Sequence, residues 1–256
     1  VYFEPSVAKR LLGEMVNAEA ALTVFHSMEL KTVKTADRRI RGIETVSRVN
    51  GAILHTEADV FIDGTYEGDL AAMAGVPYVV GRESRAEWNE EYAGKLYMDY
   101  HYDKEVLPGS TGEGDRRIQA YNYRLCLTDV PTNRIPVRKP EPYRREDYAS
   151  LVGDVRAGRI ASIRDVLNML PIPNGKTDSN NHHYCLCSSD LPEENDAYPE
   201  GNREVRAAIE LRHRLYVQGL LWFLQHDEEL PREFREDAGQ WGYAADEFED
   251  TEHFPP

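Results

Sequence analysis

Long apolar runs and a surplus of basic residues are both missing from this sequence of 256 residues. No stretch reaches the roughly 18 consecutive apolar residues that a transmembrane helix needs, so such a helix is excluded. The chain has 30 Lys and Arg against 45 Asp and Glu, a formal charge of −15. Nucleic acids and anionic membranes both favour basic surfaces. The sequence therefore predicts neither a nucleic-acid partner nor a membrane partner.

Cysteine is scarce, with three residues at Cys126, Cys185 and Cys187. Three thiols do not suggest a disulfide scaffold. Cys185 and Cys187 form a C-x-C beside His182 and His183, which invites a metal reading. Zinc sites usually pair their ligands as C-x₂₋₄-C with a second pair elsewhere, and no second pair exists here. The prediction is therefore small buried thiols and no metal site.

Several catalytic fingerprints are also absent. The sequence has no internal repeat, no Gly-x-Ser-x-Gly nucleophile turn and no GxxxxGK phosphate loop. It also has no G-x-G-x-x-G, and its one glycine cluster, at 109–115, has the wrong spacing and follows no clear strand. At 41% hydrophobic and 29% charged residues, the chain is nevertheless an ordinary globular protein that can bury a sizeable core.

The most informative stretch runs from Ala58 to Gly81. Residues 59–63 predict a short buried strand, and Asp63-Gly64-Thr65 ends it. A short helix is predicted from Gly68-Asp69 onward, over 70–74. A strand followed by a glycine-containing turn and a helix is how doubly wound α/β folds build ligand sites.

Two acids in this turn narrow the choice of ligand. Asp63 and Asp69 would repel a phosphate at short range, whereas a ribose or ribityl hydroxyl would donate a hydrogen bond to them. The turn therefore suits the sugar part of a nucleotide better than its charged part. The alternative is an ordinary β–α turn in which Asp69 is an acid stabilised by the helix dipole.

The string FIDGTYEGDLAAMAGVPYVVGRES resembles the second flavin-contacting segment of a bacterial family of FAD-dependent oxidoreductases. Three further stretches, 121–136, 173–183 and 216–227, match that family in the same order, so the resemblance covers nearly the whole chain. It implies an FAD cofactor and hydride transfer to the flavin from a small alcohol, amine or sugar-like substrate. The cofactor contacts that it implies are Leu30, Asp63, Gly64, Thr65, Gly68 and Asp69, with backbone groups near Leu30 passing the adenine.

The order of elements before the turn supports this fold. A helix is predicted over Pro5 to Asn17, strands over 21–26, 30–35, 40–46 and 52–56, and a hairpin turn at Asn50-Gly51. This order resembles the second half of an FAD-binding Rossmann domain of the glutathione-reductase type. The predicted class is α/β, α+β in the second part. A partial FAD/NAD(P)-binding Rossmann-like domain with a small β-meander occupies 1–81, and a substrate or cap domain with a mixed sheet and helices occupies 82–256.

The missing G-x-G-x-x-G is the family's pyrophosphate-binding segment. Together with the start at Val1 instead of Met, its absence indicates an internal part of a longer enzyme that lacks the first β-α-β unit. No signal peptide is visible, but a start inside a domain leaves the compartment open. The oligomeric state also stays open.

Two arginines are candidates for binding an anion. Arg124 lies in the middle of a strand predicted over 118–130, and Arg82 follows directly on the helix of the flavin-type segment. If Arg124 faces a cavity, it binds an anionic substrate or stabilises reduced, negatively charged flavin; otherwise it is a solvated strand residue. Arg82 reaches either the flavin or substrate region or a surface acid.

The acid–base candidates are Asn181, His182 and His183, which follow a turn predicted at 171–175. Histidine titrates near neutrality, so His182 or His183 would accept the substrate's proton. Asn181 would hold a substrate oxygen. Helices are further predicted over 148–155, 163–170 and 203–225, the last with a wide apolar face typical of core packing.

Two other function classes remain open from the sequence. A non-catalytic carbohydrate- or protein-binding module on an α/β scaffold is favoured by the missing pyrophosphate loop and by the aromatic segment 82–109. A polysaccharide hydrolase would need two acids facing each other in a cleft, and 45 acids cannot be sorted by sequence. The presence of bound flavin separates the first class from an oxidoreductase.

Overall fold

The computed structural model describes residues 2–99 and 105–256. The chain divides into two compact units, and each is described by itself. We call Val16–Val80 the small unit, and Val1–Met15 with Gly81–Pro256 the large unit. Among the described residues, no helix is both long enough and apolar enough to cross a membrane.

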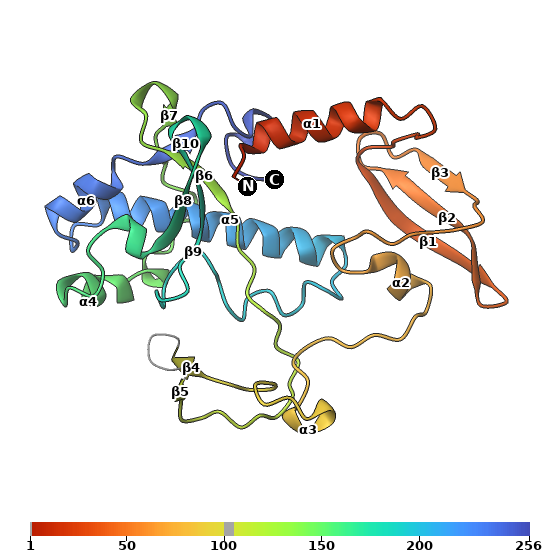
Figure 1. The fold of residues 1–256 in the computed structure, drawn as a ribbon, viewed down its shortest axis with the longest axis horizontal. Helices are drawn as coiled ribbons and strands as arrows, with labels where there is room; N and C mark the ends of the chain where they lie inside the picture. Colours follow the sequence, from red (N-terminus) through yellow and green to blue (C-terminus); the bar gives the residue numbers. More distant parts are fainter. Residues whose placement is uncertain (1, 100–104) are drawn as a thin grey trace. The chain divides into compact units, whose positions relative to one another are not determined.

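The small unit is built on a three-stranded antiparallel sheet (Figure 1). Its strands β1 (Met28–Ala36), β2 (Arg39–Ser47) and β3 (Ile53–Thr56) pair in sequence order. Asn50 accepts a hydrogen bond from the Ala52 N–H at 3.0 Å, and Gly51 has φ 73° between the last two strands. The predicted β-meander and its turn are therefore confirmed.

The helix α2 (Asp69–Met73) lies against β1 and buries Leu70. The strands predicted at 21–26 and 59–63 are wrong, because neither segment pairs with a neighbour. Val60 is 73% exposed and Ile62 is 88% exposed. An apolar segment forms a buried strand only where a neighbouring strand pairs with its backbone N–H and C=O groups. The paired strands described in this unit are β1, β2 and β3, and neither segment is among them.

The large unit contains a five-stranded antiparallel sheet in the order β7-β10-β6-β9-β8, and a two-stranded sheet of β4 and β5. Its strands are β4 (Met98–Asp99), β5 (Glu105–Val106), β6 (Leu125–Thr128), β7 (Arg134–Ile135), β8 (Leu167–Ile172), β9 (Lys176–Asn181) and β10 (Gly242–Ala244). Its helices are α3 (Arg85–Trp88), α4 (Ser150–Arg156), α5 (Arg203–His226) and α6 (Arg232–Ala238), while α1 (Pro5–Asn17) runs from this unit into the small one. Short 3₁₀ turns are η1 (Pro131–Asn133), η2 (Arg145–Asp147), η3 (Ile163–Asp165), η4 (Pro173–Gly175) and η5 (Glu249–Thr251).

The described chain is thus a mixed helix-and-sheet fold. All its strand pairings in the described residues are antiparallel. The sequence predicted a mixed sheet for the second part of the chain. The Rossmann-like assignment of the first part and the cap assignment of the second part stay predictions.

The long helix α5 supplies the core of the large unit, as predicted for 203–225. It begins where the Asn202 side chain accepts a hydrogen bond from the Val205 N–H at 3.0 Å, an N-cap. Figure 1 shows it running across the five-stranded sheet. Its buried side chains form one apolar cluster with residues of β6 and β8. At Gly219 an added Cβ would lie 2.3 Å from the Tyr148 hydroxyl, so only glycine permits this close approach.

Two predictions in this unit are corrected by the sheet. Residues 163–170, predicted as a helix, form η3 and then β8, whose buried Leu167 and Met169 alternate with more exposed residues. Every residue of β8 pairs with β9, and the turn between them holds Asn174 and Gly175 at φ 62° and 71°. The strand predicted over 118–130 is shorter, because sheet pairing is limited to β6. The predicted turn at 171–175 is confirmed.

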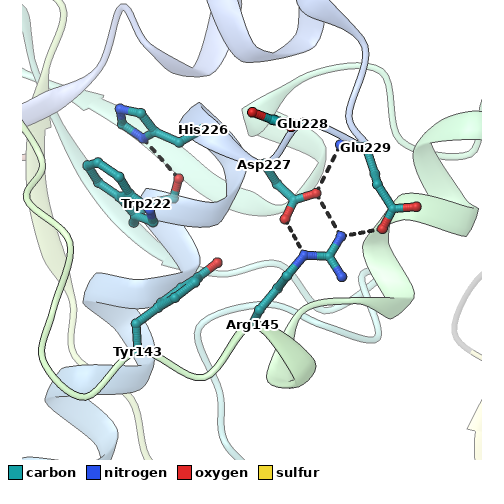
Figure 2. A pocket seen from close by; sticks show the side chains of 7 residues that line it. All are labelled: Tyr143, Arg145, Trp222, His226, Asp227, Glu228 and Glu229. Carbon is teal, nitrogen blue, oxygen red and sulfur yellow. Dashed lines mark hydrogen bonds and ion pairs between the residues drawn. The ribbon is translucent and has the colours of Figure 1, made fainter.

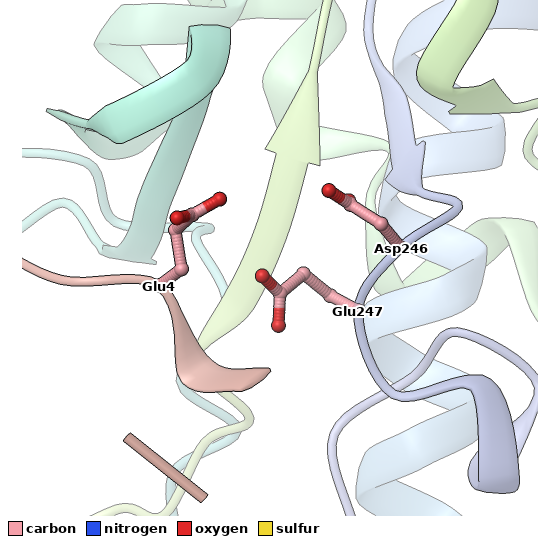
Figure 3. A group of neighbouring side chains, drawn as sticks. All are labelled: Glu4, Asp246 and Glu247. Atoms are coloured by element: carbon pink, nitrogen blue, oxygen red, sulfur yellow. The ribbon is translucent and has the colours of Figure 1, made fainter. Parts of the chain in front are cut away.

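A buried lysine fastens the first turn of α1 to the rest of the large unit. Lys176 Nζ lies 2.5 Å from Glu4 Oε1, 2.9 Å from Asp246 Oδ2 and 2.6 Å from Glu247 Oε1. Ser6 adds hydrogen bonds from its N–H and its hydroxyl to the Glu247 carboxylate. Figure 3 shows the carboxylate of Glu4 on one segment and those of the adjacent Asp246 and Glu247 on another. No described residue of α1 is buried, so polar contacts hold this end of the helix.

Candidate functional site

The turn before α2 is shaped by its own side chains. Asp63 Oδ1 accepts hydrogen bonds from the Thr65 N–H at 3.0 Å and the Thr65 hydroxyl at 2.7 Å. Its Oδ2 accepts one from the Ala71 N–H at 2.9 Å, and Thr65 Oγ1 accepts one from the Asp69 N–H at 2.9 Å. These hydrogen bonds hold the pKa of Asp63 below its ordinary value, and the bond from the Thr65 hydroxyl has the largest effect. The turn therefore stays negatively charged and ordered at neutral pH.

These contacts decide which part of FAD fits here. The N–H groups of Asp69 and Ala71 at the start of α2 are taken by Thr65 and Asp63, so they are not offered to a phosphate. A Cβ built on Gly64 or Gly68 meets no atom within 4 Å, which leaves the backbone open on that side. Carboxylates next to an open backbone fit the hydroxyls of a ribose or ribityl chain. The residues present fit the sugar part of the cofactor.

Asp69 and Leu30 complete the predicted cofactor set within the small unit. Asp69 is the half-buried first residue of α2, and Gly68 before it has φ 70°, a conformation that favours glycine. Leu30 is half-buried on β1, at a break in the register between Leu30 and Thr32. The structure therefore brings the residues at 63–69 into one turn and places Leu30 on the strand that α2 packs against.

The two predicted arginines are each already paired with a carboxylate in the large unit. Arg124 makes a two-point contact to Asp178 on β9, and its side chain is 61% exposed. Arg82 makes a two-point contact to Asp115, and the two residues also form an isolated backbone bridge. The hydrogen bonds from Arg82 lower the pKa of Asp115 to about 2. Both guanidinium groups are thus compensated within the protein.

The segment Asn181–His183 lies at the end of β9 and just beyond it. Asn181 Oδ1 accepts a hydrogen bond from the Asp190 N–H at 3.3 Å, and the His182 N–H donates to Ser188 Oγ at 2.9 Å. The rings of His182 and His183 lie 5.6 Å apart and nearly parallel, at 11°. His182 is half-buried and His183 is exposed, so the three predicted residues form one local cluster.

Next to this cluster lies a polar network that the sequence did not reveal. Asn122 Nδ2 donates to Asn180 Oδ1 at 2.8 Å and to Asp190 Oδ1 at 2.7 Å. Asn180 Oδ1 also accepts from the Asn181 N–H at 2.8 Å. Burial raises the pKa of Asp190, although the Asn122 hydrogen bond and the nearby His213 act in the opposite direction. The network joins the segment before β6, the end of β9 and the segment at 188–190.

His213 on α5 is the second group that sequence reasoning missed. Its ring is 3% exposed, and Nδ1 lies 2.9 Å from the Ile209 carbonyl oxygen. Because a carbonyl oxygen only accepts, Nδ1 carries the hydrogen and neutral His213 has its lone pair on Nε2. Among the described residues, this buried Nε2 has no hydrogen-bond partner. His213 lies far from Asn122 and Asp190 in sequence, so local sequence patterns did not single it out.

The cysteines lie in the same unit. Cys187 is buried, with Sγ 3.5 Å from the Asp147 carbonyl oxygen, and Cys185 is half-buried. Burial raises the pKa of both thiols, that of Cys185 to about 11. Within the described residues, the metal-ligating side chains that lie within reach of one another are Glu4, Asp246 and Glu247. The Lys176 ammonium already occupies the position between them.

Comparison with known proteins identifies the family of the chain. The family model described as FAD dependent oxidoreductase matches residues 1–255. No curated protein and no solved structure matches the chain significantly. A match over almost the whole chain agrees with the ordered motifs at 58–81, 121–136, 173–183 and 216–227. The chain therefore belongs to the FAD dependent oxidoreductase family, and it is an oxidoreductase whose cofactor is FAD.

Proposed function

We propose that the protein takes a hydride from a carbon that bears a hydroxyl or amine group in a small, sugar-like substrate. The observation that carries this proposal is the continuous hydrogen-bonded network from Asn122 through Asn180 and Asn181 to Asp190. Amide and carboxyl groups in one network suit the hydroxyls of a small polar molecule. His182 adjoins the network in sequence, directly after Asn181, and its N–H donates a hydrogen bond to the Ser188 hydroxyl.

Bound FAD supplies the chemistry of hydride acceptance. The residues of the chain supply binding and proton transfer. His182 or His183 accepts the proton of the substrate hydroxyl or amine, and Asn181 holds the substrate oxygen.

In the small unit, we assign Asp69 and Thr65 to the sugar hydroxyls of the cofactor, with Asp63 shaping the turn that presents them. Gly64 and Gly68 allow the cofactor close to the backbone, and Leu30 contacts the adenine through its backbone. By this proposal, 1–81 is the cofactor-binding part and 82–256 the substrate part.

The pairing of the arginines favours a neutral substrate over an anionic one. Binding a carboxylate at Arg124 or Arg82 would require breaking a two-point contact to Asp178 or Asp115. Such charge-assisted contacts are among the stronger hydrogen bonds in proteins. We therefore assign these arginines to positioning Asp178 and Asp115.

The test is anaerobic mixing of the FAD-loaded natural polypeptide with panels of small alcohols, amines, sugars and carboxylic acids. The loss of the oxidised flavin absorbance reports substrate oxidation. We expect sugars or related polyols to reduce the flavin, and His182→Gln or His183→Gln to slow the reduction about 100-fold. His55→Gln, an exposed histidine of the small unit, is the matched control. Reduction by carboxylic acids alone, or equal rates in all three variants, would contradict the proposal.

A further inference from the structure

A separate cavity of about 400 Å³ lies at the C-terminal end of α5. It is lined by side chains of α5, of the segment that follows it and of residues before and within η2 (Figure 2). The Asn122–Asp190 network contributes none of these residues. Its volume lies within the range typical of small-molecule sites.

One wall of this cavity is aromatic. Trp222 and His226, one helical turn apart, stack with ring centroids 3.5 Å apart and an angle of 10°. His226 Nδ1 lies 3.1 Å from the Trp222 carbonyl oxygen, so Nδ1 donates and the lone pair of neutral His226 is on Nε2. Tyr143 also lines the cavity and is drawn below Trp222 in Figure 2. Burial, together with the smaller effect of the Asp227 charge, raises the pKa of Tyr143 to about 12. The Tyr143 hydroxyl therefore remains a donor at neutral pH.

The other wall is a row of acids after the helix. Asp227 accepts hydrogen bonds from Arg145 Nε at 2.6 Å and Nη2 at 2.9 Å, and Glu229 also pairs with Arg145. Burial raises the pKa of Asp227, but the Arg145 hydrogen bonds outweigh it, so the net shift is downward. In the part of the chain that the structure describes, the exposed Glu228 carboxylate has neither a hydrogen-bond nor an ion-pair partner. The wall therefore offers fixed acceptor oxygens and one carboxylate that still lacks a donor.

This combination suits a ligand with many hydroxyl donors and an apolar ring face. An organic cation would prefer several open aromatic faces. Here His226 covers one face of Trp222, and Tyr143 has Lys139 Nζ 5.1 Å from its centroid and Tyr148 stacked beside it. The partly buried Trp222 indole lines the cavity with carboxylates alongside. This arrangement instead matches a sugar, whose C–H groups pack on the ring while its hydroxyls donate to the oxygens.

We propose that this cavity is a saccharide-binding site, in which a pyranose ring packs on Trp222 and donates hydrogen bonds to Glu228 and to the carboxylates held by Arg145. The site does not depend on the reaction assigned above, because its residues lie outside the cofactor turn and the Asn122–Asp190 network. Its role is to hold a sugar, either as a second binding point for a longer substrate or as a separate ligand.

The test uses ¹⁵N-labelled, FAD-loaded natural polypeptide and three probes: methyl α-D-glucopyranoside, methyl β-D-galactopyranoside and methyl α-D-mannopyranoside. Trp222 is one of the three tryptophans in residues 1–256, and Trp222→Phe assigns its indole N–H signal. We expect at least one glycoside to shift the Trp222 signal in a saturable way and to leave Trp88 and Trp241 unchanged. Trp222→Ala should abolish the binding.

Because Trp222 is half-buried, the exposed Glu228 provides the variant that keeps the fold. Loss of a hydrogen bond to a charged group predicts about 10-fold weaker binding in Glu228→Gln, measured by calorimetry. Glu233→Gln, an exposed acid on α6, should bind the glycoside unchanged. The proposal is overturned if no glycoside shifts Trp222 up to about 100 mM, well above weak millimolar affinities. It is also overturned if Glu228→Gln binds like Glu233→Gln, or if tetramethylammonium shifts Trp222 and the glycosides do not.

Discussion

Replacing Lys176 by methionine should destabilise the large unit more than any exposed ion pair can account for. The Lys176 side chain is 0% exposed, and its ammonium lies within 2.9 Å of carboxylate oxygens of Glu4, Asp246 and Glu247 (Figure 3). Glu247 is itself 1% exposed. Lys176→Met therefore leaves a buried carboxylate without its counter-charge.

The expected cost follows from the burial of both partners. Removing one partner of a buried ion pair typically costs about 3 to 5 kcal/mol, since an uncompensated charge stays behind. Met fills most of the aliphatic volume of Lys176, so the loss reports the charge and not a cavity. The double variant Lys176→Met/Glu247→Gln should recover part of that loss, because it removes the buried charge as well.

Urea unfolding at neutral pH, followed by circular dichroism, measures these free energies. The matched control is Arg124→Met, which breaks an exposed arginine–aspartate pair on the same sheet. Exposed pairs contribute about 1 kcal/mol or less. The reasoning is refuted if Lys176→Met costs no more than Arg124→Met, or if Glu247→Gln fails to compensate it.

Two further predictions concern packing and acid stability. Gly219→Ala places a Cβ 2.3 Å from the Tyr148 hydroxyl and should cost about 1 to 3 kcal/mol. The control is Gly153→Ala in α4, where an added Cβ meets no atom within 4 Å, and it should stabilise the protein by about 0.5 to 1 kcal/mol. Thermal unfolding compares the two variants, and equal effects would contradict the close approach of Gly219 to Tyr148. Hydrogen bonds from Asn174 and then from Lys176 lower the folded-state pKa of Glu4. Burial raises the pKa of Asp246, but hydrogen bonds from Asn133 and Lys176 outweigh it, so the net shift is also downward. The stability from these two carboxyls is full above their ordinary pKa values and is lost as the pH falls through the lowered ones. Urea unfolding between about pH 7 and pH 3 should therefore show a smaller fall in Lys176→Met than in the native protein, and an equal fall would oppose the assignment.

Local patterns in the sequence predicted the elements that depend on local interactions. The helix of Pro5–Asn17, the strands at 30–35 and 40–46 with their later hairpin, and the long helix α5 all occur as predicted. A periodic apolar face fixes a helix, and adjacent strands joined by short turns form a meander with nearby partners.

The wrong predictions all involve partners distant in sequence or unpaired segments. Residues 163–170 have helix-compatible spacing, but pairing with β9 makes β8 of their second half. The segments 21–26 and 59–63 have strand composition and no described partner. Propensity is a weak prior that tertiary context overrides in both directions.

The site shows the same division. The turn at 63–69 could be found because its residues lie together in sequence, and the structure explains why Asp63 is there: it holds Thr65 and the start of α2. The Asn122–Asp190 network could not be found, because its residues come from the segment before β6, the end of β9 and the segment at 188–190, which are distant in sequence.

The most direct test of the central claim is titration of the natural polypeptide containing residues 1–256 with FAD, in the native form and in two variants of the small unit. Asp69→Ala removes the acid assigned to the cofactor's sugar, and Asp59→Ala removes an exposed acid just before the turn. Flavin absorbance and fluorescence report binding. The account predicts one bound FAD, at least about 10-fold weaker binding in Asp69→Ala, as expected for a lost hydrogen bond to a charged group, and unchanged binding in Asp59→Ala. Equal affinity in the two variants would contradict the placement of the cofactor at this turn, and no binding in any form would contradict the account as a whole.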